Sequence, residues 1–198
     1  MIIDLLRHGE PRGGVRYRGH GCDDPLSEQG WRQMWQAVGE SSVDWPWDGV
    51  LSSPLARCRD FAEALCARRP MPLRVASGLR EVGFGDWEGL TREQVRGGHP
   101  DEYRAFYADP VANRPPGAEP LADFRRRVEA TLAAESAALG VRKILVVAHA
   151  GVIRAVIGWV MDAPDAAIYR IECDYGSISR VSRDAERGWR VGFTNRRR

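Results

Sequence analysis

Two mostly apolar runs in this chain each end at a histidine. Residues 2–6 lead through Arg7 to His8, and residues 143–148 lead to His149. Such runs are typical of buried strands in a parallel sheet, where ligands bind beyond the carboxyl ends of the strands. A single histidine in this place is most often an ordinary loop residue, but the repeated pattern favours a site. Because Arg7 and His8 are costly to bury without an anionic partner, we predict an anion site that holds a nucleophile.

The remaining pattern predicts helices and strands in alternation, which indicates an α/β domain. Its 198 residues are expected to form one domain over 1–198. We expect helices at residues 27–38, from 53 onward, at 121–139 and at 152–161. We expect strands at 48–52 and 73–75, and an antiparallel edge of the sheet at 168–173, 177–182 and 189–193.

Three further segments carry candidate functional residues. Residues 11–25 form a loop rich in Gly and Arg, which either faces a substrate or is an ordinary solvated loop. Arg57 lies in the first turn of a predicted helix, where a cation is unfavourable unless an anion is bound nearby; the alternative is a plain surface arginine. Residues 79–89 have no regular period, and tertiary contacts of their aromatic side chains are expected to hold them. The carboxylates available there for proton transfer are Glu81, Asp86 and Glu88.

The composition narrows the classes of partner. The net charge is +2 and the arginines are spread along the chain, so nucleic acid is not an expected partner. No apolar run is long enough to span a bilayer, and the chain opens on a core strand, so neither a membrane partner nor a signal peptide is expected. The scattered cysteines favour reduced thiols in a cytoplasm and argue against a zinc site; they are Cys22, Cys58, Cys66 and Cys173.

Four motifs in a fixed order resemble the histidine phosphatase superfamily, which includes the phosphoglycerate mutases. They are Arg7-His-Gly-Glu, Leu51-Ser-Ser-Pro-Leu-Ala-Arg, Leu79-Arg-Glu with Phe84-Gly-Asp-Trp-Glu-Gly, and Val147-Ala-His-Ala-Gly. The tripeptide Arg-His-Gly by itself is weak evidence for this family. The four motifs in this order are specific evidence, and together they span nearly the whole chain. The resemblance implies a single histidine phosphatase domain with a three-layer α/β/α, phosphoglycerate mutase-like architecture and a mostly parallel central sheet.

The resemblance also implies roles for particular residues. His8 would be the nucleophile that becomes phosphorylated, and Glu81 the proton donor. Phosphate would be bound by Arg7, Arg57 and His149 together with His8, with Arg18 and Gly19 as further binding candidates. The chain departs from the family where many members have Ser or Thr and then Asn, because it has Pro11 and Gly14 instead. One usual phosphate contact is therefore in question.

The chemistry of phosphoryl transfer fits these residue types. The transferred group needs its charge compensated, and without a metal motif or an expected cofactor arginines must supply that compensation. Neighbouring arginines are expected to lower the pKa of His8, while a backbone carbonyl holds its second ring nitrogen. The resemblance implies Glu81 as the general acid, and by alternation around Trp87 we expect Asp86 and Glu88 to point away from that ring, towards solvent or structural partners.

Within the superfamily, the short chain favours a phosphatase over a mutase. Its length and the Tyr17-Arg-Gly-His loop most resemble the α-ribazole phosphatases, which remove a 5′-phosphate in cobalamin assembly. A broad-specificity or sugar phosphatase and a phosphoglycerate mutase remain alternatives. A non-catalytic phosphate-binding module would be expected to lack His8 or Glu81, and both are present. The expected partner is a small-molecule phosphate ester, and a homodimer is left open.

Overall fold

A six-stranded sheet forms the centre of the protein. The computed structural model describes residues 1–39 and 45–197. The strands lie in the order β3-β2-β4-β1-β5-β6. Strands β3, β2, β4 and β1 are parallel neighbours, whereas β5 and β6 are antiparallel. The strand bounds are Ile2–Arg7 for β1, Gly49–Ser52 for β2, Leu73–Val75 for β3, Lys143–Ala148 for β4, Ile178–Asp184 for β5 and Gly188–Arg196 for β6.

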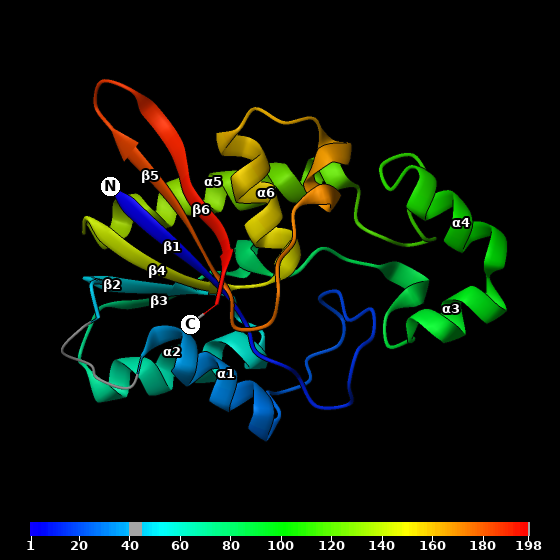
Figure 1. Ribbon diagram of the computed structural model, residues 1–198, viewed down its shortest axis with the longest axis horizontal. Coiled ribbons are helices and arrows are strands. Elements are labelled where there is room, and N and C mark those ends of the chain that lie inside the picture. The colour runs from blue at the N-terminus through cyan, green and yellow to red at the C-terminus, as the bar shows by residue number, and fades with distance from the viewer. Residues whose placement is uncertain (40–44, 198) are drawn as a thin grey trace.

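The helices form the two outer layers and an outlying pair. Their bounds are Glu28–Val38 for α1, Ala56–Arg68 for α2, Arg92–Gly98 for α3, Pro100–Ala108 for α4, Leu121–Leu139 for α5 and Ala150–Val160 for α6. Short 3-10 helices lie at η2 (Ser77–Leu79), η3 (Gly85–Trp87) and η4 (Asp165–Arg170). Figure 1 shows α1 and α2 on one face of the sheet, α5 and α6 on the other, and α3 with α4 beyond its edge.

Each face of the sheet buries its own apolar core, because side chains alternate between the two faces along a strand. Ile3 and Leu5 of β1 pack with α5 and α6, whereas Leu6 packs with α1 and α2. The buried strands β1 and β4 therefore have a helix layer on either side, as parallel strands require. The predicted three-layer α/β/α architecture with a mostly parallel sheet is confirmed.

The register of β1 against β4 brings the two histidines together. Arg7 pairs with Ala148 at the carboxyl ends of these strands, and the His8 amide donates to the carbonyl of Ala148 at 2.9 Å. The side chains of His8 and His149 therefore leave the sheet at the same edge. This arrangement confirms the prediction that both strand ends meet.

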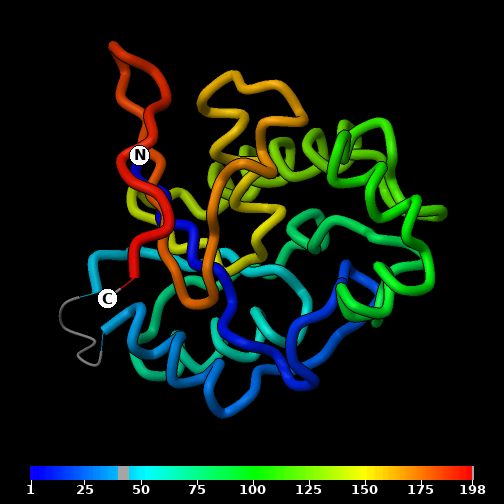
Figure 2. Tube along the Cα trace, turned by 45° about the vertical axis from the view of Figure 1, so that its right-hand side comes forward, coloured from blue at the N-terminus to red at the C-terminus, as the bar shows by residue number. Residues whose placement is uncertain are grey.

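The loop after β1 lies against the outlying helices α3 and α4 (Figure 2). The Tyr17 ring packs in a small aromatic cluster with Trp87 and Phe106. The hydroxyl groups of Tyr17 and Tyr107 are hydrogen-bonded at 2.9 Å. The loop predicted to face a substrate is thus tied to α4 at the edge of the sheet where the histidines lie.

Several sequence-based predictions of elements are wrong. No strand forms over 168–173: residues 168–170 belong to the 3-10 helix η4, because Ile168 packs tightly against α6 at Gly158, where a Cβ would lie 2.7 Å from its side chain, and residues 171–173 lie outside the strands. Helix α6 begins at Ala150 and not at Val152. Helix α2 begins at Ala56 and not at Ser53. The Ser53 side chain instead accepts from the Leu55 amide at 3.3 Å, so residues 53–55 form a turn before the helix.

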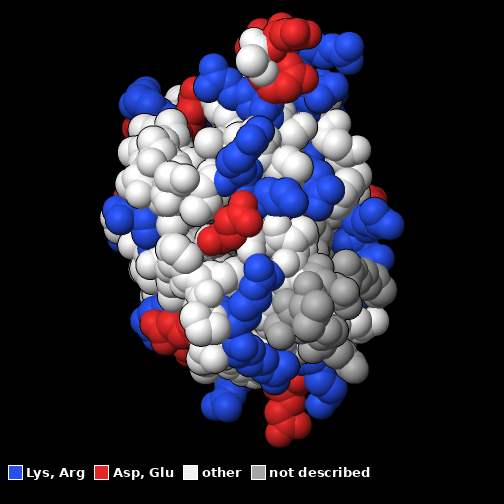
Figure 3. Space-filling view, turned by 90° about the vertical axis from the view of Figure 1, so that its left-hand side faces the viewer, with Lys and Arg blue, Asp and Glu red and all other residues white. Residues whose placement is uncertain are grey.

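The surface shows no concentration of one charge on the face in Figure 3, where basic and acidic side chains lie among uncharged ones. Within residues 1–39 and 45–197, no helix has the length and apolar character needed to cross a membrane.

We predict that the ion pair between buried Asp4 and Arg180, whose side chain is 37% exposed, contributes to stability. Asp4 is 2% exposed and accepts hydrogen bonds from Arg180 Nε at 2.7 Å, Arg180 Nη2 at 2.8 Å and Trp47 Nε1 at 2.8 Å. Asp4→Asn would leave these donors poorly matched and should lower the free energy of unfolding by about 2–3 kcal/mol. Urea denaturation measures the change. Asp101→Asn, at an exposed pair with Arg104, is the control and should have little effect. An unchanged midpoint for Asp4→Asn would contradict the prediction.

Candidate active site

His8 is buried with its ring orientation fixed. Its side chain is 5% exposed, and Nδ1 lies 2.7 Å from the carbonyl oxygen of Gly9. A carbonyl can only accept, so Nδ1 carries a proton and Nε2 is the unprotonated nitrogen of the neutral ring. Burial lowers the pKa of His8 well below its ordinary value, and Arg57 and then Arg7 lower it further. The predicted direction of the pKa and the carbonyl contact are both found, although burial and not the arginines is the largest cause.

His149 lies beside His8 and is fully buried. The two ring centroids are 5.1 Å apart in an edge-on arrangement. Nε2 of His149 is 2.7 Å from the hydroxyl oxygen of Ser53, and burial followed by the charge of Arg57 lowers the pKa of this ring. The side chain is 0% exposed and does not line the cavity in front of His8. Direct contact between His149 and phosphate stays a prediction.

Arg7 and Arg57 reach the site from β1 and α2. Arg57 is 1% exposed, and it donates from Nη1 to the carbonyl of Cys22 at 2.9 Å and from Nη2 to that of Gly19 at 3.0 Å. Arg7 donates from Nη1 to the carbonyl of Cys173. Neither arginine has a carboxylate partner within the described residues, and the Nε atom of each is buried without a hydrogen bond there. Both can therefore bind an external anion.

Arg18 and Gly19 are also at the site, as predicted. Both line the cavity in front of His8, and Arg18 adds to the positive potential at the His8 ring. Arg18 Nε pairs with Asp24 at 2.9 Å, and its Nη2 donates to the carbonyl oxygen of Gly14 at 2.7 Å. The departure of Gly14 from the family pattern thus lies in a loop whose backbone anchors a pocket arginine.

Glu81 lines the same cavity, and its carboxylate accepts from backbone amides. Oε1 accepts from the Val82 amide at 2.9 Å, and Oε2 accepts from the Gly151 amide at 3.2 Å. Asp86 and Glu88 do not line the cavity. Of the three carboxylates only Glu81 therefore lines the cavity, and its role as proton donor stays a prediction.

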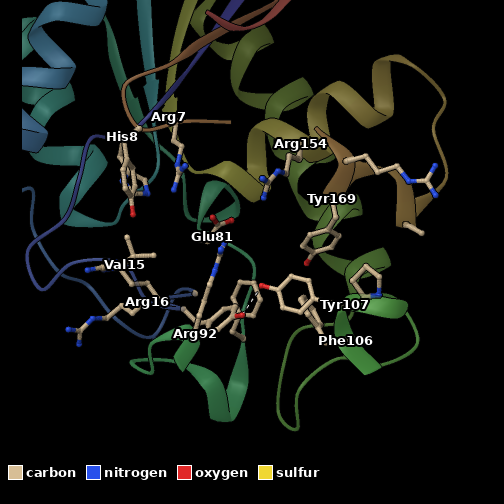
Figure 4. A pocket seen from close by; sticks show the side chains of 18 of the residues that line it. Arg7, His8, Val15, Arg16, Glu81, Arg92, Phe106, Tyr107, Arg154 and Tyr169 are labelled. Atoms are coloured by element: carbon tan, nitrogen blue, oxygen red, sulfur yellow. Dashed lines mark hydrogen bonds between the residues drawn. The ribbon is translucent and has the colours of Figure 1, made fainter. Parts of the chain in front are cut away.

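The cavity has a volume of about 520 Å³ and two kinds of wall. Close to His8 its charged residues are Arg7, Arg18 and Arg57. Further out, aromatic rings from η4 and from residues 84–107 form the wall, and Figure 4 shows Arg92 and Arg154 pointing into the same space. The aromatic lining residues are Tyr17, Phe84, Phe106, Tyr107, Tyr169 and Tyr175. The cavity thus suits an ester with an anionic group at His8 and a larger group outward.

Sequence reasoning missed two residues that contact the histidines and arginines. The Tyr175 ring lies 5.6 Å from the His8 ring, and the Arg7 guanidinium stacks over it at 4.0 Å. Ser53 bonds His149. Ser53 belongs to one of the four motifs and could have been read as a site residue. Tyr175 has no comparable signal, because only folding brings residue 175 beside β1.

Comparison with known proteins gives a consistent picture. The sequence model described as histidine phosphatase superfamily (branch 1) matches residues 3–196. An adenosylcobalamin/alpha-ribazole phosphatase of Salmonella typhimurium is 30% identical over 183 residues, which cover 91% of this chain and 90% of that protein. A bifunctional protein of Mycobacterium tuberculosis is 32% identical over 176 residues, or 88% of this chain. The chain spans about half of that mycobacterial relative, namely 48% of its length.

Solved structures share the fold over nearly the whole chain. The alpha-ribazole phosphatase from Shigella flexneri has a TM-score of 0.84 and 28% identity, covering 99% of this chain and 96% of that one. A mycobacterial glucosyl-3-phosphoglycerate phosphatase has a TM-score of 0.85 and 28% identity, covering 100% and 99%.

We predict an acid limb in the pH profile that depends on Arg57. The pKa of His8 lies well below 6.5, so its ring is neutral at pH 7 and any loss of nucleophile on acidification should occur below pH 6.5. Arg57→Gln removes the second-largest cause of that low pKa and should move the limb to higher pH. Profiles of kcat/KM on one phosphate ester measure this, because the ionisation of the ester is common to both proteins. Arg170→Gln is the control, since Arg170 lines the outer cavity. An unmoved limb in Arg57→Gln would disprove the assignment.

Proposed function

The chain belongs to the histidine phosphatase superfamily, and on this premise we propose that it hydrolyses a small phosphate monoester through a phosphohistidine on His8. The observation that carries the proposal is the buried His8 ring, whose Nδ1 proton is directed at the Gly9 carbonyl, beside Arg7 and Arg57, neither of which has a carboxylate partner among residues 1–39 and 45–197. Such a ring is a nucleophile at neutral pH, and its surroundings attract a phosphate dianion.

The reaction proceeds in two steps. Nε2 of His8 attacks phosphorus in line, the bond from phosphorus to the ester oxygen breaks, and Glu81 gives its proton to the departing oxygen. Water then gives a proton to the Glu81 carboxylate and attacks the phosphohistidine, which releases phosphate and restores the ring. Arg7 and Arg57 compensate the charge on the equatorial oxygens throughout, with Arg18 and the Gly19 backbone beside them.

The lining of the outer cavity indicates which leaving group the site can accommodate. Its aromatic wall supports a planar or nucleoside-like leaving group, and with the similarity to α-ribazole phosphatases this favours α-ribazole 5′-phosphate as the substrate. The second candidate is a sugar ester with its own negative charge, which Arg92 and Arg154 would accommodate. Phosphate release from the two esters, compared by kcat/KM, separates these candidates. A third outcome, transfer of phosphate to another substrate hydroxyl without net release, would identify a mutase.

The state of the cysteines supports a proposal for the cellular compartment. The four cysteines are free, and a cytoplasmic location is therefore part of the proposal.

Trapping the intermediate tests the proposal directly. Wild-type enzyme quenched during turnover in excess EDTA should carry acid-labile, base-stable phosphate on His8, located by mass spectrometry. His8→Ala should abolish both the label and turnover. His149→Ala should slow turnover while His8 can still be labelled. A label on another residue, or activity that requires an added metal ion, would refute the mechanism.

A second prediction concerns the proton donor. Glu81→Gln should slow hydrolysis of an alkyl or ribosyl phosphate about 10²–10⁴-fold, because their leaving oxygens need a proton. It should slow p-nitrophenyl phosphate less, since p-nitrophenolate leaves without one. Asp86→Asn and Glu88→Gln are the controls, and neither should distinguish the two substrates. Equal slowing of both substrates by Glu81→Gln would show that another group is the donor.

A further inference from the structure

Glu88 joins two segments that are far apart in the chain. Its Oε2 accepts from the Gly21 amide at 2.8 Å, in a turn within the loop of residues 11–25. Its Oε1 accepts from the Phe84 amide at 2.9 Å. Both carboxylate oxygens are thus engaged by backbone, and no arginine within the described residues forms an ion pair with them. The side chain lies outside the cavity wall, so it does not touch the substrate in the proposed reaction.

The turn is shaped to fit this carboxylate. A Cβ placed on Gly19 would lie 1.7 Å from Glu88 Oε1, and one placed on Gly21 would lie 2.1 Å from Oε2. Gly19 has a φ of +54°, whereas Gly21 lies outside the left-handed region. Any side chain at either position would therefore displace the turn or the carboxylate. The backbone of the turn rests directly against Glu88.

The same turn holds Arg57. The carbonyl oxygens of Gly19 and Cys22 accept from the two terminal nitrogens of Arg57 at 3.0 and 2.9 Å. Arg57 is 1% exposed, and of the charged groups around His8 it lowers the pKa of that ring most. A shift of these carbonyls would move the guanidinium relative to His8. The path from Glu88 to Arg57 therefore runs through four residues of backbone.

We propose that Glu88 is a positioning residue, which fixes the turn of residues 19–22 so that the carbonyls of Gly19 and Cys22 hold Arg57 beside His8. The inference rests on the proposed function, because it assigns Arg57 to the phosphate. An arginine held only by its own flexible side chain would sample many positions, and displacement of a catalytic group by about 1 Å can slow a reaction about 10²-fold. The Glu88 carboxylate restricts that freedom without neutralising the charge of Arg57.

A double-mutant cycle tests the connection to Arg57. Glu88→Gln keeps the size of the side chain but replaces one accepting oxygen with a donor, and it should lower kcat/KM by about 10- to 100-fold. It should also weaken inhibition by orthovanadate by a similar factor. In an Arg57→Ala background the same change should have less than about a 2-fold effect on either quantity, because Glu88 would act through the missing group. Equal effects of Glu88→Gln in both backgrounds would overturn the proposal.

A size-relief experiment tests the contact from the side of the turn, by adding a methyl group at Gly21 with and without the Glu88 side chain. Gly21→Ala should mimic Glu88→Gln in the otherwise wild-type protein, because the new methyl group displaces the turn. In a Glu88→Ala background the methyl group has room, so Gly21→Ala should then change kcat/KM by less than about 2-fold. If Glu88→Gln does not fold, the comparison of Gly21→Ala in the wild-type and Glu88→Ala backgrounds tests the positioning role instead. A Gly21→Ala enzyme with wild-type kinetics would overturn the proposal.

The control is another carboxylate that accepts from backbone amides, at the other end of the sheet; it also pairs with Arg190. Asp184 accepts from the amides of Glu186 and Arg187, in the turn between β5 and β6. Asp184→Asn should leave kcat/KM and orthovanadate inhibition unchanged. Wild-type protein that fails to hydrolyse any phosphate ester would reject the proposed function. Active wild-type protein with additive effects of Glu88→Gln and Arg57→Ala would reject only the positioning role.

Discussion

The arginines nearest to His8 are held by main-chain carbonyl groups, and the site depends on this choice of partner. Arg57 donates to Gly19 and Cys22, and Arg7 donates to Cys173. A carboxylate in the same place would orient the guanidinium equally well but would cancel its charge. A carbonyl dipole fixes the direction of the side chain and leaves the positive charge available for an external anion. A nucleophilic imidazole among such cations must then remain neutral. Deep burial and the charges of Arg57 and Arg7 keep His8 neutral, whereas the Gly9 carbonyl fixes which ring nitrogen carries the proton.

Much of this arrangement could be predicted from local sequence, because it lies at the ends of strands. His8 and His149 each follow a strand, and parallel pairing places the ends of neighbouring strands at one edge whatever the intervening loops do. Inferences of this kind need only the direction of each strand and the alternation of side chains between its two faces. The family resemblance favours Glu81 over Glu88 as the proton donor; of the two only Glu81 lines the cavity, and its role stays a prediction.

Features that depend on distant packing could not be predicted. Residues 168–170 alternate like a strand, yet Gly158 of α6 leaves space for Ile168 and the segment winds into η4 instead. Whether His149 faces the ligand or the interior depends on Ser53, which lies 96 positions away in the sequence. The approach of Tyr175 to His8 likewise has no local signal. In each case a contact between separate elements decides the outcome, and sequence patterns describe only one element at a time.

The pairing of β1 with β4 has a consequence for biosynthesis. Strand β1 is synthesised long before its partners, because its parallel neighbour begins only at Lys143 and its antiparallel neighbour β5 begins at Ile178. This apolar strand therefore stays unpaired until those later residues have been made. Such long sequence separations slow folding and expose nascent chains to aggregation, and they make early engagement by a chaperone advantageous. They also mean that the pocket cannot assemble before β4 and β5 have been made.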